Sequence, residues 1–220
     1  MDFEKARFNM VEQQIRPWNV LNPRVLDVIS EVPREIFAPE QYKNLAYVDT
    51  RIPLGSFENT PCTMANPIIE GRILQEMDIQ PDDLILEIGT GSGYLTACLA
   101  KLGRHVDSVD INNDLTTAAQ KHLQTLNINN VNLATGDASK TWQQKRNYDV
   151  IVISAAMKTI PDSYKNLLKT NGRLFIVAGD APVMTAYRVT RTDQKNWDTE
   201  ELFETCIEPM IQTVEPAFSF

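Results

Sequence analysis

The chain has 220 residues, of which 43% are hydrophobic, 23% are charged and 8% are aromatic. These values are typical of a globular protein with one sizeable core, and they exclude a disordered or fibrous chain. The formal net charge of −8 repels phosphate backbones, so nucleic acid is not expected as a partner.

No segment has the apolar length of a signal peptide or of a membrane span, which predicts a soluble cytoplasmic protein with no membrane partner. The three cysteines, Cys62, Cys98 and Cys206, lie far apart and form no Cys-x-x-Cys pair. Neither a disulfide framework nor a bound metal is therefore expected, and reduced thiols fit the cytoplasm.

Residues 1–80 are predicted to form a mainly helical extension that contributes to an acceptor site. Apolar residues recur at helical spacing over 3–15, Asn22 is placed to cap a second helix that ends before Pro33, and a third helix runs from Pro67 towards Pro81. The intervening residues 36–55 are rich in turn formers and are predicted to be irregular.

Strands and helices alternate after Pro81. The pattern predicts strands at 84–88, 105–111, 131–137, 149–155 and 173–179, and helices at 94–103, 113–128 and 160–172. Such alternation predicts a parallel sheet with helices on both faces, in a doubly wound α/β sandwich. Two more strands, at 184–191 and 201–208, are joined by a short polar loop, so antiparallel pairing is expected at one edge. The prediction for 81–220 is a seven-stranded, mostly parallel, Rossmann-like domain.

The most informative segment is the glycine-rich turn after the first of these strands, which reads Glu87-Ile88-Gly89-Thr90-Gly91-Ser92-Gly93. Glycines at this position allow a ligand to approach the backbone closely, and the following helix offers free N–H groups. The spacing is G-x-G-x-G, whereas a dinucleotide-binding turn has G-x-G-x-x-G. The acidic Glu87 suits the positive charges of S-adenosylmethionine and would repel a pyrophosphate. The turn therefore predicts S-adenosylmethionine as cofactor, with S-adenosylhomocysteine as product.

Two further acidic residues follow the next strands in the sequence. Asp110 ends the second strand, where a carboxylate can accept both ribose hydroxyl protons. Asp137 follows the third strand and could accept from the adenine amino group. The predicted cofactor contacts are Glu87, Gly89, Thr90, Gly91, Ser92, Gly93, Asp110, Ile111, Asp137, Ala138 and Ser154.

The chain resembles the protein-L-isoaspartate O-methyltransferase family over most of its length. The resemblance rests on the segments MVEQQI, VPREIFAPE, AYVDTRIPLG, ILEIGTGSGYLTACLA, NVNLATGDA, YDVIVISAA, GRLFIVAG and LFETCIEPM, which occur in the family's order. It implies the methyltransferase α/β sandwich with a helical N-terminal extension. The reaction that it implies is methylation of an isoaspartyl carboxylate in damaged proteins.

One segment departs from the family's pattern. The family shows Gly-Gln-Thr-Ile-Ser at its substrate and active site, whereas this chain reads Thr60-Pro61-Cys62-Thr63-Met64-Ala65-Asn66 before Pro67. Aligned on Pro67, Ala65 stands at the serine and Asn66 at a position where the family often has glutamine. The family's hydroxyl is missing here unless Thr60 or Thr63 replaces it. Thr60, Thr63, Ala65 and Asn66 are the predicted catalytic positions.

Methyl transfer to a carboxylate requires neither a general acid nor a general base, because the leaving group departs neutral and the acceptor is ionised near neutral pH. His105 and His122 are accordingly expected to be structural or exposed. Three functions remain open: transfer to an isoaspartyl carboxylate on a peptide or protein, transfer to a different acceptor such as a small molecule, and cofactor binding without catalysis. Glu87 and the glycine spacing oppose a dinucleotide oxidoreductase. The sequence does not predict an oligomeric state.

Overall fold

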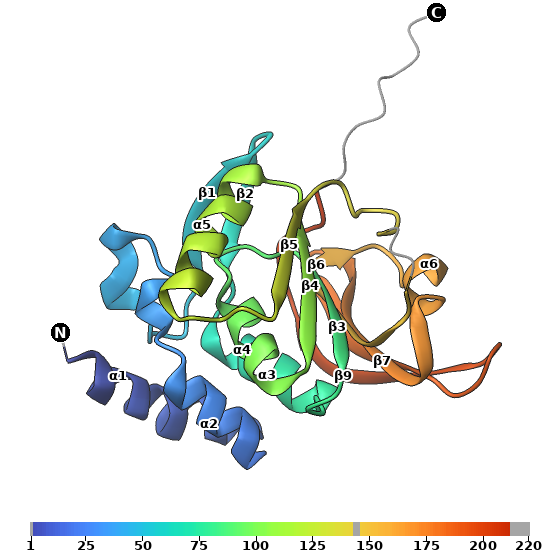
Figure 1. Cartoon of the computed structure of the whole chain (residues 1–220), viewed down its shortest axis with the longest axis horizontal. Coiled ribbons are helices and arrows are strands. Elements are labelled where there is room, and N and C mark those ends of the chain that lie inside the picture. The colour runs from blue at the N-terminus through green and yellow to red at the C-terminus, as the bar shows by residue number, and fades with distance from the viewer. Residues whose placement is uncertain (1, 143–145, 212–220) are drawn as a thin grey trace, which may run out of the picture.

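The computed structural model describes residues 2–142 and 146–211, so the predicted domain 81–220 extends beyond the described residues at 143–145 and 212–220. The chain begins with helical segments (Figure 1). In order these are α1 (Phe3–Met10), a π-helical turn (Val11–Ile15), a 3-10 turn (Arg16–Trp18), α2 (Pro23–Glu31) and two more 3-10 turns (Arg34–Ile36 and Glu40–Leu45). The predicted cap of α2 is confirmed, because the Asn22 side chain accepts a hydrogen bond from the Arg24 N–H at 3.0 Å.

A β-hairpin follows, formed by β1 (Ile52–Phe57) and β2 (Thr60–Met64). Its start falls within residues 36–55, which were predicted to be irregular, and this prediction is wrong from Ile52 onwards. The two turn residues, Glu58 and Asn59, both have positive φ, of 47° and 64°. Two positive φ values in a two-residue turn match the twist of the strands on either side. The turn formers of this segment, which include Pro53 and Gly55, made it resemble a loop.

The central sheet has seven strands in the order β5-β4-β3-β6-β7-β8-β9. All neighbours pair in parallel except β8, which runs antiparallel to β7 and to the edge strand β9. The bounds are β3 (Leu84–Ile88), β4 (His105–Asp110), β5 (Val131–Thr135), β6 (Tyr148–Met157), β7 (Leu168–Asp180), β8 (Val183–Arg191) and β9 (Trp197–Thr205). The predicted doubly wound fold and its antiparallel edge are confirmed. Strand order reverses between β3 and β6, where such folds bind ligands.

Four helices accompany the sheet: α3 (Pro67–Met77), α4 (Tyr94–Leu102), α5 (Asn113–Thr125) and α6 (Asp162–Lys165). Figure 1 shows α4 and α5 on the side that faces the N-terminal helices, and α6 on the opposite side. The predicted helix over 160–172 is wrong beyond α6, because β7 begins at Leu168. Leu168 pairs with Tyr148, and the next residue of β7 in register is Arg173, opposite Val150. The residues between them bulge out of the ladder.

Two buried apolar clusters lie on the two faces of the sheet. One includes Ile85, Val150 and Phe175 and continues into Ile29 and Met77. The other is built from residues that include Leu86, Ile151, Tyr164 and Leu174. The helical extension therefore packs into the same core as one face of the sheet, which fixes its position relative to the carboxyl ends of the strands.

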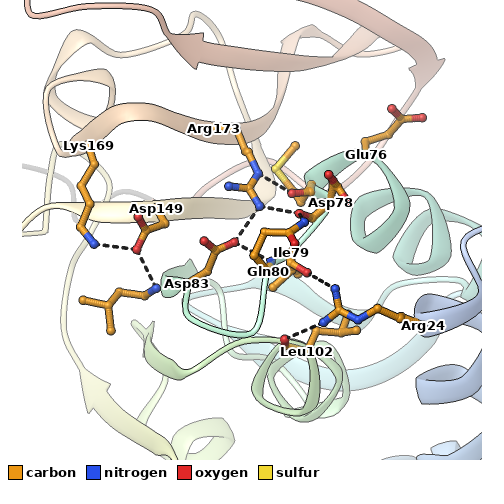
Figure 2. A network of polar contacts seen from close by, with 12 residues as sticks. Arg24, Glu76, Asp78, Ile79, Gln80, Asp83, Leu102, Asp149, Lys169 and Arg173 are labelled. Carbon is orange, nitrogen blue, oxygen red and sulfur yellow. Dashed lines mark hydrogen bonds and ion pairs between the residues drawn. The ribbon is translucent and has the colours of Figure 1, made fainter.

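Charged side chains connect the opposite, amino ends of the strands (Figure 2). Arg173 donates to Asp83 at 2.6 Å and to the Asp78 carbonyl at 2.6 Å. Asp149 accepts from Lys169 at 2.7 Å and from the Leu84 N–H at 2.9 Å. This network joins the loop before β3 to β6 and β7. Within residues 2–142 and 146–211, no helix combines the length and apolarity that crossing a membrane requires.

Candidate cofactor and acceptor site

The glycine-rich turn lies between β3 and α4, and its backbone requires glycine. Gly89, Gly91 and Gly93 have φ values of +96°, +53° and +87°. A Cβ atom at Gly89 would lie 2.4 Å from Ser154 Oγ, and one at Gly93 would lie 2.9 Å from Ala119 Cβ. The turn therefore leaves bare backbone at the end of β3, where β6 approaches it from the other side.

Asp110 lies beside this turn at the end of β4 and lines the cavity. One of its oxygens accepts from the Gly91 N–H at 2.8 Å, and the other accepts from the Asn112 N–H at 2.9 Å. Burial raises the pKa of this carboxyl, while these backbone N–H groups oppose the rise. Each oxygen retains a lone pair for a donor on a ligand. Asp110 does not cap α5, because the Asn112 side chain accepts from Asp114 N–H instead.

The end of β5 also reaches the cavity, but Asp137 does not line it. Gly136 and Ala138 are lining residues, whereas Asp137 is exposed and accepts from the Ser139 N–H at 2.8 Å. On the opposite side, Ser154 lines the cavity and donates to the Gly89 carbonyl at 2.9 Å. The wall thus combines backbone and small side chains from three strand ends.

Glu87 is fully buried beneath the turn and is not a lining residue. Its Oε2 accepts from Thr96 at 2.5 Å and from Ser108 at 2.6 Å, and Ser108 also bonds Thr90 at 2.6 Å. Among the described residues, Glu87 Oε1 has no hydrogen-bond partner. Burial raises the pKa of Glu87 to about 8, against the effect of the two hydroxyl donors. This network supports the turn from below.

The hairpin β1–β2 provides the opposite wall. Thr63, Ala65 and Asn66 line the cavity, while Thr60 lies at the hairpin turn, away from it. The Asn66 amide is partly engaged, because it donates to Asp49 at 2.9 Å. Of the four predicted catalytic positions, the structure brings three to the cavity that the cofactor turn also lines. The remaining predicted cofactor residues that line it are Gly89, Thr90, Gly91, Ser92 and Ile111, and Gly93 does not.

A buried ion pair holds the backbone carbonyl of Ala65 in place. Arg34 is fully buried and its guanidinium pairs with Glu70, donates to the Ala65 carbonyl and lies 4.6 Å from the centre of the Tyr94 ring. Burial raises the pKa of Glu70, and Arg34 opposes this rise. Glu70 also lines the cavity. Neither residue was predicted for the site, although Arg34 belongs to the VPREIFAPE segment on which the family resemblance rests.

The C-terminal part of the described chain closes the remaining side. The Glu208 carbonyl accepts from the Ala156 N–H at 2.8 Å, and the Met210 N–H donates to the Ala156 carbonyl at 2.7 Å, which attaches this segment to the end of β6. The Glu208 carboxylate accepts a hydrogen bond from Arg51 at 2.6 Å, and both residues line the cavity. Arg51 and Glu208 were not predicted, because nothing in the sequence indicates a contact between residues so far apart.

The composition of the wall limits the ligand. Among the described lining residues, three are acidic (Glu70, Asp110 and Glu208) and one is basic (Arg51). A pyrophosphate would meet more negative than positive charge here. His122 bonds the Ser92 carbonyl and His105 lies near Asp107, so neither histidine reaches the cavity. A positively charged sulfonium with a ribose and an adenine fits this wall better than a dinucleotide.

Comparison with known protein families identifies the chain. A family model described as protein-L-isoaspartate(D-aspartate) O-methyltransferase matches residues 5–213. The chain belongs to this family. A protein-L-isoaspartate O-methyltransferase from Protochlamydia amoebophila is 37% identical over 92% of this chain and 95% of its own length. One from Petrotoga mobilis is 33% identical over 91% of this chain and 92% of its own length.

A solved structure agrees in fold. A Plasmodium falciparum protein named for the same methyltransferase activity, whose crystal structure holds S-adenosyl-L-homocysteine, matches with a TM-score of 0.79. The match covers 97% of this chain and 100% of that one, at 19% identity. The predicted family and methyltransferase sandwich are confirmed, and S-adenosylmethionine is the cofactor that this isoaspartate methyltransferase family uses.

Proposed function

We propose that this protein transfers the methyl group of S-adenosylmethionine to the side-chain carboxylate of isoaspartyl residues in damaged peptides and proteins. The observation that carries the proposal is the shared cavity. The bare turn at Gly89 and Gly91 lies on one wall, and the hairpin residues Thr63 and Ala65 lie on another. A donor bound at the turn and an acceptor at the hairpin would meet there.

The cofactor supplies an electrophilic methyl group, and the residues of the chain position the donor and the acceptor relative to each other. Asp110 would hold the ribose hydroxyls, and the glycine turn would admit the methionyl part. The apolar residues Ile73, Leu95 and Phe175 line the same cavity and would limit the access of water. An ionised carboxylate needs no base to attack, which fits a wall without histidine among the described residues. Orientation and exclusion of water would provide the rate.

The acceptor side supports a carboxylate but differs from the family at Ala65. Of the hydroxyl side chains that line the cavity, Thr63 is the closest to Ala65 in the sequence. We therefore infer that Thr63 takes the place of the family's serine. The altered segment also favours the second candidate, in which a small molecule is the acceptor.

We further infer a cytoplasmic location from the free state of the three cysteines.

A labelled-methyl assay with paired peptides tests the proposal. The two peptides have one sequence and differ only in an isoaspartyl or a normal aspartyl linkage. Base-labile methyl ester on the isoaspartyl peptide alone is the expected result. Transfer to neither peptide would contradict it, and a subsequent screen of small carboxylic acids would then distinguish a different acceptor from a protein that binds the cofactor without catalysis.

A further inference from the structure

Arg51 and Glu208 form an ion pair in the wall of the cavity. Arg51 lies directly before β1, and Glu208 lies after β9 in the segment attached to the end of β6. The guanidinium and carboxylate are 2.6 Å apart, and both side chains remain partly exposed, at 43% and 29%. Both residues line the cavity. The pair is therefore a part of the cavity wall that solvent reaches.

Arg51 is the single cationic side chain among the lining residues that the structure describes. The acidic Glu70 is already paired with the buried Arg34, and Asp110 lies at the cofactor end. Ala65 has no side-chain donor, and the Asn66 amide donates to Asp49. A carboxylate that enters this cavity meets negative charge at Asp110 and Glu208, and Arg51 alone offers it a charge-assisted hydrogen bond.

We propose that Arg51 binds the acceptor carboxylate, and that Glu208 occupies Arg51 until the substrate arrives. This inference rests on the proposed function and assigns the recognition of its carboxylate to a residue of this chain. Exchange of one carboxylate for another at the guanidinium needs no proton transfer, and it leaves Glu208 as an ionised carboxylate that is partly exposed to water.

The same exchange reverses after the reaction. A carboxylate oxygen forms the new O–CH3 bond while the electron pair of the C–S bond stays on sulfur, which gives a neutral ester and a neutral thioether. The ester has lost the charge that Arg51 attracts, and Glu208 can pair with Arg51 again. Because negative charge on the acceptor falls in the transition state, Arg51 acts more on substrate binding than on the chemical step.

Four variants test this proposal: Arg51→Gln, Arg51→Lys, Glu208→Gln, and Arg16→Gln as a control. Arg16 is an exposed arginine with its own ion pair to Glu12. Steady-state kinetics with the isoaspartyl peptide would be combined with calorimetry of S-adenosylhomocysteine and thermal unfolding. We expect Arg51→Gln to raise KM about tenfold with kcat changed less than about threefold. Arg51→Lys retains most of the binding, and Glu208→Gln lowers KM.

The opposite direction of the Arg51→Gln and Glu208→Gln effects is the decisive result. If both variants raise KM alike, the pair is only a structural bridge and the proposal is wrong. If Arg51→Gln weakens S-adenosylhomocysteine binding, Arg51 holds the cofactor's carboxylate and the proposal is also wrong. If the wild-type protein forms no ester on the peptide, the proposed function itself fails, and the role of Arg51 fails with it.

Discussion

Replacing Gly89 by alanine tests whether the turn needs bare backbone. At φ +96° a Cβ atom costs about 1–2 kcal/mol in the backbone. The new Cβ would also lie 2.4 Å from Ser154 Oγ, which must rotate away from its bond to the Gly89 carbonyl at about 1 kcal/mol. The total of about 2–3 kcal/mol corresponds to a fall in Tm of about 4–12 °C for a chain of this size.

A second background separates the two contributions. Ser154 Cβ lies at 3.7 Å from the new Cβ, an ordinary contact, so in a Ser154→Ala protein only the backbone cost of about 1–2 kcal/mol remains. The assay is thermal unfolding of the four proteins of this double-mutant cycle, with S-adenosylhomocysteine affinity measured in parallel. Equal losses from Gly89→Ala in both backgrounds would refute the reasoning, because the Ser154 hydroxyl would then not be the obstacle.

Three further predictions concern the acceptor wall, the buried acid and the charged network. Ala65→Ser restores a hydroxyl to the cavity and should raise kcat/KM for the isoaspartyl peptide about two- to tenfold, the value of one neutral hydrogen bond; unchanged kinetics would show that the hydroxyl does not reach the acceptor. Burial raises the pKa of Glu87 to about 8, above its value of about 4.5 in the unfolded chain. The protonated carboxyl therefore contributes its full share of the folding free energy below about pH 4.5, and this contribution is lost as the pH rises through about 8. The Glu87→Gln side chain cannot ionise, so the Tm of this variant should rise relative to the Tm of the wild type as the pH increases across that range. A difference in Tm that stays constant with pH would contradict the raised pKa of Glu87. Arg173→Met leaves the largely buried Asp83 without its charged partner, with only the Gln80 N–H still donating to it, and should cost about 2–3 kcal/mol in denaturant unfolding. A loss within about 0.5 kcal/mol would show that the network is dispensable.

Local sequence patterns predicted the sheet because they report the periodicity of single elements. The apolar run Leu84–Ile88 and the turn after it identified both the strand and the cofactor wall, and Asp110 was found because it follows the next strand. The helix expected over 160–172 was wrong because Leu168 pairs with Tyr148 of β6, a contact that no local pattern reports. Tertiary pairing therefore overrode local propensity at this point.

The missed site residues depend on contacts between distant parts of the chain. Arg34 reaches Glu70 and Ala65 only after the helical extension packs on the sheet, and Arg51 reaches Glu208 only after the last strand is in place. Glu87 shows the complementary case. The sequence predicted Glu87 as a cofactor contact. Its carboxylate instead lies beneath the turn, where it accepts hydrogen bonds from Thr96 and Ser108 and does not line the cavity.

The Arg51–Glu208 contact spans 157 positions of the chain. Closure of so long a loop is entropically costly and belongs among the slow events of folding. Because synthesis starts at the N-terminus, the nascent chain contains the glycine turn well before it contains Glu208. A chain shortened before Glu208 would lack both the carboxylate that pairs with Arg51 and the backbone hydrogen bonds that attach this segment to the end of β6, so the cavity would lose that side of its wall.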